Sequence, residues 1–241
     1  MGPRDSSDRR CLRRGGWRPH AYLQYDRAVV QTEAGAPVSS ADSGAGSALS
    51  ANYVWTGRYF DTVNNPTRGY GVGLELGGGL TLSGHRDPFQ RTVFRWLALR
   101  PLADGRLQLR TELGAVLARA SAQVPSTQMF RTGGDTTVRG YGYRNIGVVL
   151  PNGQIGPGRY EAVGSVEWQR PIKRNGLPSN FESVLFVDTG AVSDRLSALR
   201  FSTGVGTGVR WKSPVGPVQA DVAYGIKARR FRLHMSVGFV F

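Results

Sequence analysis

Apolar and polar residues take turns along much of this chain, and this period of two limits its fold more than any other feature of the sequence. Near the C-terminus one parity consists of Phe231, Leu233, Met235, Val237, Phe239 and Phe241. The other parity consists of Arg232, His234, Ser236 and Gly238. Only an extended strand puts every second side chain on the same face. The sequence therefore predicts a chain built from β-strands.

The same alternation recurs upstream, at residues 70–76, 107–115, 201–211 and 218–226. We predict further strands at 53–60, 91–100, 162–170 and 183–189, and a less regular one at 21–30. Together these segments make about ten strands, each near the length of a strand that crosses a membrane. The faces of 91–100 are not assigned, because Arg95 shares its parity with Val93 while Trp96 lies on the other.

The second face of most predicted strands is small and polar, with many glycines and charged residues. Such a face does not fill the core of a soluble β-sandwich, which is the alternative fold for these aliphatic and aromatic residues. A barrel in a bilayer has the reverse arrangement, with apolar residues facing lipid around a polar lumen. We therefore predict an all-β fold, a transmembrane antiparallel β-barrel in the outer membrane of a bacterium.

Composition is compatible with a barrel and excludes a helical membrane protein. No apolar run approaches the roughly 18 residues that a spanning helix needs. Barrel strands need apolar residues only at alternate positions, so a mean hydropathy of -0.29 fits them. The net charge of +14 would suit nucleic acid or an acidic membrane surface. Because the basic residues are scattered singly and no nucleic-acid-binding motif accompanies them, we predict no nucleic acid partner.

The chain divides into a short N-terminal segment and one barrel domain. Residues 1–20 show no interpretable pattern, and we expect them to be disordered. Residues 21–241 form the barrel domain, with long connections at one rim and short turns rich in Pro and Gly at the other. The connection from Pro171 to Glu182 is longer than this rule prefers. The longest connection, residues 121–160, holds a glycine-rich, charged segment and is the candidate functional insert.

That segment, from Phe130 to Tyr141, resembles the VRGY loop of the outer-membrane assembly superfamily that includes BamA, TamA and the two-partner secretion transporters. The matching residues are Gly133, Gly134, Asp135, Val138, Arg139, Gly140 and Tyr141. Further motifs of the family occur in the family's order at residues 66–69, 166–171, 186–190, 204–211 and 213–217. The last two, followed by Asp221, are most similar to the TamA branch, the translocation and assembly module proteins. Several ordered motifs make the resemblance specific over residues 55–241.

The resemblance implies a larger barrel than this chain can form. Barrels of the superfamily have roughly sixteen strands, within the even-numbered bacterial range. The chain would supply the C-terminal portion, about ten strands, without the periplasmic POTRA repeats that precede such barrels. We therefore expect a C-terminal fragment, or a gene read from an internal start.

The resemblance also implies that the loop folds into the lumen, where its arginine meets acidic groups on the wall. Here the arginine is Arg139, and the acids are Glu167 and Asp188. The residue pattern agrees for Glu167, which shares its parity with Ser165 and Gln169 and so faces the lumen. A guanidinium can engage two carboxylates through charge-assisted hydrogen bonds and thereby hold a long loop against the wall.

Two further groups of residues complete the candidate site. Gly204, Gly206 and Gly208 share the lumen face of one strand, and glycines there suggest that another backbone approaches closely. The docked loop is the expected neighbour. The C-terminal residues resemble a β-signal, the ending recognised during barrel insertion, through His234, Phe239 and Phe241, although Ser236 stands where glycine is usual.

These features favour a non-enzymatic role in assisting the insertion or secretion of outer-membrane proteins such as autotransporters. The resemblance implies the lipid bilayer and client proteins as partners, with a TamB-like inner-membrane protein as a further one. We expect no cofactor and no metal site, since His20, His85 and His234 have no metal-ligand spacing. The alternative is a passive pore, or a polypeptide transporter of the two-partner secretion type, in which the loop narrows a conduit.

Overall fold

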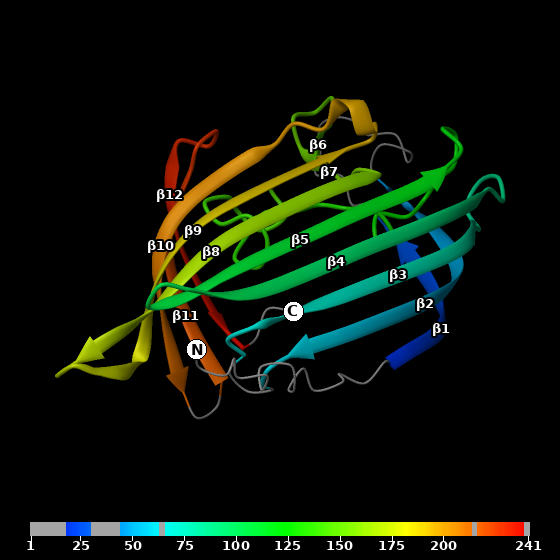
Figure 1. Cartoon of the computed structure of the whole chain (residues 1–241). Coiled ribbons are helices and arrows are strands. Elements are labelled where there is room, and N and C mark those ends of the chain that lie inside the picture. The colour runs from blue at the N-terminus through cyan, green and yellow to red at the C-terminus, as the bar shows by residue number, and fades with distance from the viewer. Residues whose placement is uncertain (1–17, 30–43, 63–65, 214–215, 239–241) are drawn as a thin grey trace.

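Ten antiparallel strands form one curved sheet in the computed structural model, which describes residues 18–29, 44–62, 66–213 and 216–238 (Figure 1). The strands are β1 (Arg18–Ala28), β2 (Gly46–Phe60), β3 (Gly69–Thr81), β4 (Pro88–Leu102), β5 (Gly105–Ala118), β8 (Tyr160–Arg174), β9 (Leu177–Ser193), β10 (Ser202–Ser213), β11 (Gly216–Gly225) and β12 (Arg230–Val237). Each strand pairs with the next one along the chain, so β1 and β12 are the two edges of the sheet. The predicted all-β antiparallel fold of about ten strands is confirmed.

The sheet begins and ends at slightly different places from those predicted. β1 starts at Arg18, so residues 18–20 belong to the sheet and not to a disordered N-terminal segment. Their backbone pairs with residues 54–56 of β2, which is why they are extended despite a sequence with little pattern. Residues 1–17 lie outside the described part, as do Phe239 and Phe241 of the proposed β-signal. Within the described residues no helix has the length and apolar character to cross a membrane.

The longest connection, residues 119–159, lies at the opposite rim of the sheet from the two-residue turns at 103–104 and 175–176. The segment from Pro171 to Glu182, expected to be an overlong connection, belongs instead to the two longest neighbouring strands, β8 and β9. These strands continue to a two-residue turn at Asn175 and Gly176, whose φ angles are 52° and 79°. Two successive positive φ angles match the twist of a hairpin, and asparagine and glycine tolerate them best. The length rule for this rim therefore holds.

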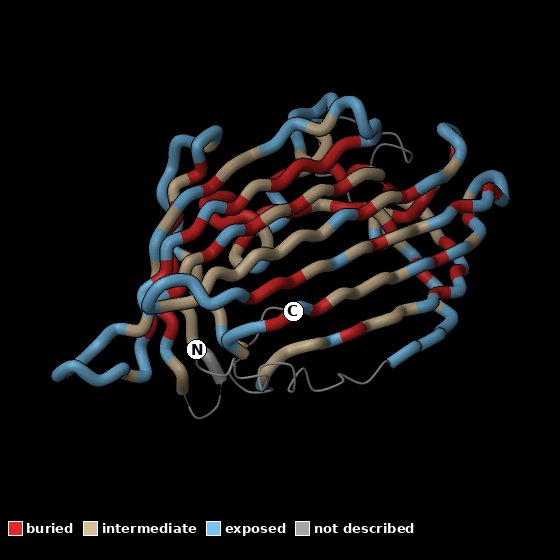
Figure 2. The backbone as a smooth tube through the Cα atoms, in the orientation of Figure 1, coloured by how far each residue is buried: buried red, intermediate tan, exposed pale blue. Residues whose placement is uncertain are grey.

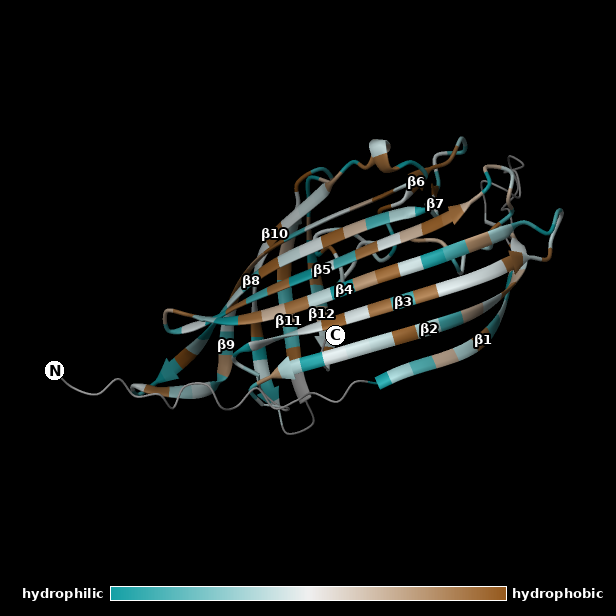
Figure 3. Ribbon diagram, turned by 45° about the vertical axis from the view of Figure 1, so that its right-hand side comes forward, coloured by the Kyte–Doolittle hydropathy of each residue, from teal (hydrophilic) through white to brown (hydrophobic). Residues whose placement is uncertain are grey.

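Hydrophobic and hydrophilic residues alternate along the strands, as the period of two predicts (Figure 3). On β9, Leu185 and Val187 are exposed on the convex face, whereas Val184, Phe186 and Asp188 are buried on the concave face. Figure 2 shows the same alternation of buried and exposed positions along neighbouring strands. The convex face is therefore an apolar surface, as lipid contact requires.

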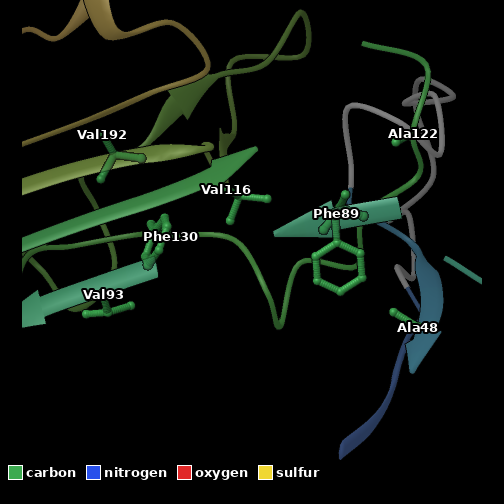
Figure 4. Close-up of a cluster of buried hydrophobic side chains, with 8 residues drawn as sticks. Ala48, Phe89, Val93, Val116, Ala122, Phe130 and Val192 are labelled. Atoms are coloured by element: carbon green, nitrogen blue, oxygen red, sulfur yellow. The ribbon is translucent and has the colours of Figure 1, made fainter. Parts of the chain in front are cut away.

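The concave face is less uniformly polar than the sequence suggested. On β4 the inner parity is that of Val93, Arg95 and Leu97, because Val93 pairs with inward-facing Gly114 and Arg95 with inward-facing Glu112. Trp96 and Phe94 point to the other side. Val93 is buried in an apolar cluster, here called the base cluster, that also contains Ala48, Phe89, Val116, Ala122, Val124, Phe130 and Val192 (Figure 4).

Phe130, which comes from the long connection, explains these inward apolar residues. The connection between β5 and β8, residues 119–159, runs on the concave side of the sheet (Figure 1). Its two arms pair through isolated bridges from Phe130 to Gly158 and from Thr132 to Ile146. A two-stranded element, β6 (Val148–Val149) with β7 (Ile155–Gly156), lies between them in sequence. A lumen lined by a folded insert needs apolar side chains where the insert packs, and polar ones elsewhere.

Candidate functional site

The tip of this connection is shaped by a glycine turn. Gly133 and Gly134 have φ angles of 105° and 115°, a region that side chains other than glycine rarely enter. The turn closes on itself, since the Gly133 amide donates to Thr137 Oγ1 at 2.9 Å and the Gly134 amide to the Val138 carbonyl at 3.1 Å. Val138 is buried against Tyr141, Ile146 and Val163. The turn thereby presents the next residue, Arg139, to the wall of the sheet.

Arg139 donates hydrogen bonds to carboxylates on three strands. Its Nε and Nη2 atoms bind the two oxygens of Asp188 at 2.7 and 3.0 Å. Its Nη1 atom binds Glu167 Oε2 at 2.9 Å and Asp221 Oδ2 at 2.8 Å. The backbone amide of Arg139 adds a bond to Asp188 Oδ2 at 3.1 Å. Four of the five N–H donors of a guanidinium are thus used, which fixes its position and orientation.

A second arginine of the wall completes this group. Arg210 on β10 donates from Nη2 to Glu167 Oε2 at 3.0 Å and to Asp221 Oδ2 at 3.1 Å, and its Nη1 binds the other oxygen of Asp221. Ser165 Oγ donates to Asp188 Oδ1 at 2.6 Å. Arg139, Glu167, Asp188, Arg210 and Asp221 are here called the tip cluster.

The tip cluster is almost dry. Asp188 is 0% exposed and the other four residues are 4% exposed. Burial acts to lower the pKa of the Arg139 guanidinium, but the hydrogen bonds and charge of Asp188, with the charge of Glu167, raise that pKa above its ordinary value. The arginine therefore stays charged at any physiological pH. Charges taken out of water in this way are stable only while each is paired, so the loop and the wall need one another.

The three lumen glycines have different neighbours. A Cβ on Gly204 would collide with the Arg139 carbonyl, so this glycine faces the loop backbone as expected. A Cβ on Gly206 would instead meet the Val222 carbonyl of β11 and the Phe186 ring, and a Cβ on Gly208 would meet the carboxylate of Asp221. For these two residues the expected contact with the loop is wrong. They accommodate wall side chains that themselves meet Arg139, whose guanidinium carbon lies 3.4 Å from the centroid of the Phe186 ring.

The residues beside Arg139 contact the remaining strands of this half of the sheet. The Gly140 amide donates to His234 Nε2 on β12 at 2.9 Å. Tyr141 Oη donates to the Thr203 carbonyl on β10 at 3.1 Å and accepts from the Lys227 amide at 3.2 Å. Three successive loop residues thus contact β8 to β12. Asp135 lines a cavity beside His234.

Sequence reasoning brought Arg139, Glu167 and Asp188 together as the structure does, but it missed Asp221, Arg210 and Arg110. Arg110 on β5 donates from Nη2 to the Thr137 carbonyl at 3.1 Å and supports the turn. Each of the three lies at the inward parity of its strand. A buried charge on a lumen face needs a partner, and that rule alone would have marked them. Among the described residues no group of His, Cys, Asp and Glu is arranged to hold a metal ion.

Known proteins resemble this chain in sequence and in fold. A family model for the Omp85 superfamily domain matches residues 11–241. The outer membrane protein assembly factor BamA of Nitratidesulfovibrio vulgaris (strain Hildenborough) is 32% identical over 173 residues, which are 68% of this chain and 21% of that protein. A crystal structure of BamA from Haemophilus ducreyi lacking POTRA domains 1–3 superposes with a TM-score of 0.60 at 18% identity, over 80% of this chain and 41% of that one. This chain therefore spans about a fifth of the curated relative's length.

Proposed function

Because the chain belongs to the Omp85 superfamily, we propose that it is the barrel part of a factor that assembles proteins into the bacterial outer membrane. The observation that carries the proposal is the docking of the loop tip, through Arg139, Gly140 and Tyr141, onto five consecutive strands of the wall. The relative from N. vulgaris is named as an outer membrane protein assembly factor, which supports the same role here.

The lipid bilayer is the first partner that the proposal requires. Outward residues such as Leu185, Val187 and Leu233 are large, apolar and exposed on the convex face. In water this surface would drive aggregation, whereas lipid stabilises it at about 25 cal/mol per Å² of apolar area removed from water. The aromatic pair Phe181 and Trp211, stacked at 6.3 Å near the short-turn rim, suits the level of the lipid headgroups.

Client outer-membrane proteins are the second proposed partner. The edges β1 and β12 present backbone N–H and C=O groups that only another strand can pair without water. A docked loop keeps the wall between β8 and β12 in one shape, so that an edge is held ready for such pairing. The action involves no covalent chemistry and no cofactor.

Within the superfamily we propose the TamA-like branch, with autotransporters as clients and a TamB-like inner-membrane protein as partner. Support comes from the run Gly208 to Trp211 followed by Ser213 to Pro217 and Asp221, of which Gly208, Arg210 and Asp221 meet at the tip cluster. The similarity to a BamA protein supports the superfamily role and leaves the branch to experiment. Copurification with a TamB-like protein, against copurification with BamA-type accessory lipoproteins, separates the branches.

The test is client insertion by the protein at its natural length, reconstituted in liposomes. Arg139→Ala should abolish the protease-protected insertion of an autotransporter barrel. The matched control is Arg144→Asn, which removes a charge from an exposed residue of the same loop, where φ is 52° and asparagine is tolerated. Equal insertion by Arg139→Ala and the wild type would refute the proposal.

The alternative, a passive pore, gives the opposite pattern in the same liposomes. A loop that occupies the lumen speaks against a pore, since the tip lies across the wall from β8 to β12. A pore would conduct ions without inserting clients, and Arg139→Ala would raise its conductance. Ion conductance and client insertion are therefore measured together for each variant.

A further inference from the structure

His234 occupies an unusual place for a residue of a C-terminal insertion signal, because its side chain binds the loop. It lies on the edge strand β12 at the inward parity, with Arg232 and Ser236, and it is partly buried. Its Nε2 atom accepts the hydrogen bond from the Gly140 amide at 2.9 Å. A backbone N–H group can only donate a hydrogen bond. Nε2 must therefore be the unprotonated nitrogen, and the imidazole is neutral.

Two successive loop residues contact two paired residues of the sheet. Asp221 on β11 and His234 on β12 are register partners across the last strand pair. Arg139 binds Asp221, and Gly140 binds His234. Gly140 reaches this position because it has no side chain and a φ of 91°, and a Cβ there would collide with the Gly225 backbone. The loop tip therefore spans one rung of the β11–β12 ladder.

That rung exists only in the observed register. A slip of one residue would turn His234 to the lipid face, and a slip of two would move it by about 7 Å along the strand. Either change breaks the bond to Gly140. Among the described residues β12 pairs with β11 alone, so fewer ladder bonds specify its register than that of an inner strand.

His234 also lines a cavity that separates part of the loop from β12. A polar cavity of about 430 Å³ lies between the loop turn and β12, lined by Gly134, Asp135, Tyr143, Arg232 and His234 among others. The bond from Gly140 to His234 lies beside this cavity and is a direct polar contact between the loop tip and β12.

We propose that His234 is a positioning residue that couples the docking of the loop to the register of the edge strand β12. When the loop is docked, the strand is held in one register. When β12 shifts, the loop tip loses its contact with the strand. The coupling itself does not depend on what the protein does. Its importance for client insertion rests on the assembly function proposed above.

The test replaces His234 with either of two side-chain amides of different length, in the protein at its natural length reconstituted in lipid. In His234→Gln the amide oxygen takes nearly the position of Nε2, so the bond to Gly140 is kept. In His234→Asn the oxygen stops at the position of Nδ1, and the bond is lost. Hydrogen exchange at the Gly140 amide should be roughly tenfold faster in His234→Asn and near the wild-type rate in His234→Gln, as the loss of one ordinary hydrogen bond implies.

Register is measured independently by disulfide trapping. Ala220 and Met235 are register partners on the outward face, so Ala220→Cys with Met235→Cys should form a disulfide efficiently in a background where Cys11 is serine. In His234→Asn, Ala220→Cys should also trap cysteine placed at Leu233 or Val237, two residues away on β12. His234→Gln should trap only the native pair.

The outcomes separate this proposal from the assembly function. Wild-type exchange and trapping in His234→Asn would overturn the coupling, and so would equal changes in both variants, which would mean that the imidazole acts by its shape. Altered exchange and trapping in His234→Asn with wild-type client insertion would support the coupling and count against an assembly role for this edge. Loss of insertion in His234→Asn, kept in His234→Gln, supports both.

Discussion

The loop is anchored at two places by different physical means. At the tip cluster, Arg139 is held by charge-assisted hydrogen bonds to three buried carboxylates. At the base cluster, Phe130 is buried among aliphatic side chains from other parts of the sheet, including Val93 and Val116. Paired charges fix direction and distance and fail when one partner is missing, whereas apolar contacts tolerate small shifts but need matching volume. The loop thus has one anchor that specifies its position and one that adds contact area.

The largest effect is expected at the tip. Arg139→Ala leaves Asp188 buried with Ser165 Oγ and without its guanidinium, and the three carboxylates of the cluster then face a single arginine, Arg210. The free energy of unfolding should fall by about 3–5 kcal/mol, the range for removing one partner of a buried ion pair. Urea unfolding in a lipid bilayer measures this change. Arg144→Asn, an exposed site, should stay within about 0.5 kcal/mol of the wild type. A similar small change for Arg139→Ala would show that the tip is hydrated and carries little stability.

Phe130→Ala should cost about 3 kcal/mol through lost burial and a residual cavity. The ring is 5% exposed and lies against Gly114, and the Arg91 guanidinium is 5.1 Å from its centroid. The same urea experiment measures it, with Tyr143→Ala at an exposed loop site as the control. A loss of stability smaller than that of Tyr143→Ala would show that the base cluster does not anchor the loop.

The double variant Arg139→Ala with Phe130→Ala tests whether the anchors act independently. Independent anchors give additive losses within about 0.5 kcal/mol. A combined loss well below the sum would mean that releasing one end already frees the whole loop.

The family motif made the tip far more predictable than the base. Arg139 and Glu167 could be paired from the motif and from strand parity, and Asp188 from the motif alone. The inward positions of Phe89 and Val93 could not be interpreted from the sequence, because apolar residues do not suit a wet lumen until Phe130 is known to pack there. Their partner is distant in sequence, and no local pattern encodes such a contact. Strand ends were also misjudged where pairing extends a strand of weak pattern, as at Arg18.

A smaller loss of stability is expected from substituting a glycine that lies against the loop backbone, compared with a glycine elsewhere in a strand. Gly204→Ala places a methyl group against the Arg139 carbonyl and should cost about 1–3 kcal/mol by overpacking. Gly164→Ala is the matched control, since its nearest neighbour would be Thr189 Cγ2 at 3.6 Å and alanine costs less entropy in a strand. Thermal unfolding of both variants is the measurement. Equal behaviour of the two glycines would contradict a close approach of the tip.

The smallest effect on stability is expected at Asp61, which belongs to neither anchor. Burial acts to raise the pKa of Asp61, but hydrogen bonds from Thr67 and neighbouring amides lower it below its ordinary value of 3.8. Because the pKa of Asp61 is lower in the folded than in the unfolded protein, the ionised carboxylate stabilises the fold at any pH above the unfolded pKa. This stabilisation is lost as the pH falls through the folded pKa. The stability difference between wild type and Asp61→Asn should therefore be full at neutral pH and disappear in acid. Unfolding at a series of pH values checks this, and a difference that persists at pH 2 would contradict it.

Contact of Arg139, Gly140 and Tyr141 with successive strands has a mechanical consequence for the molecule. Strands that slide along one another must shear their ladder, and here any such movement between β8 and β12 would also tear a bond to the loop. This half of the wall is therefore stiff in shear. On β1 and β2 the loop is held by fewer contacts, among them the hydrogen bond from Gln128 Nε2 to Asp26 Oδ2 at 2.6 Å and the packing of Ala48 in the base cluster, so movement there breaks fewer bonds.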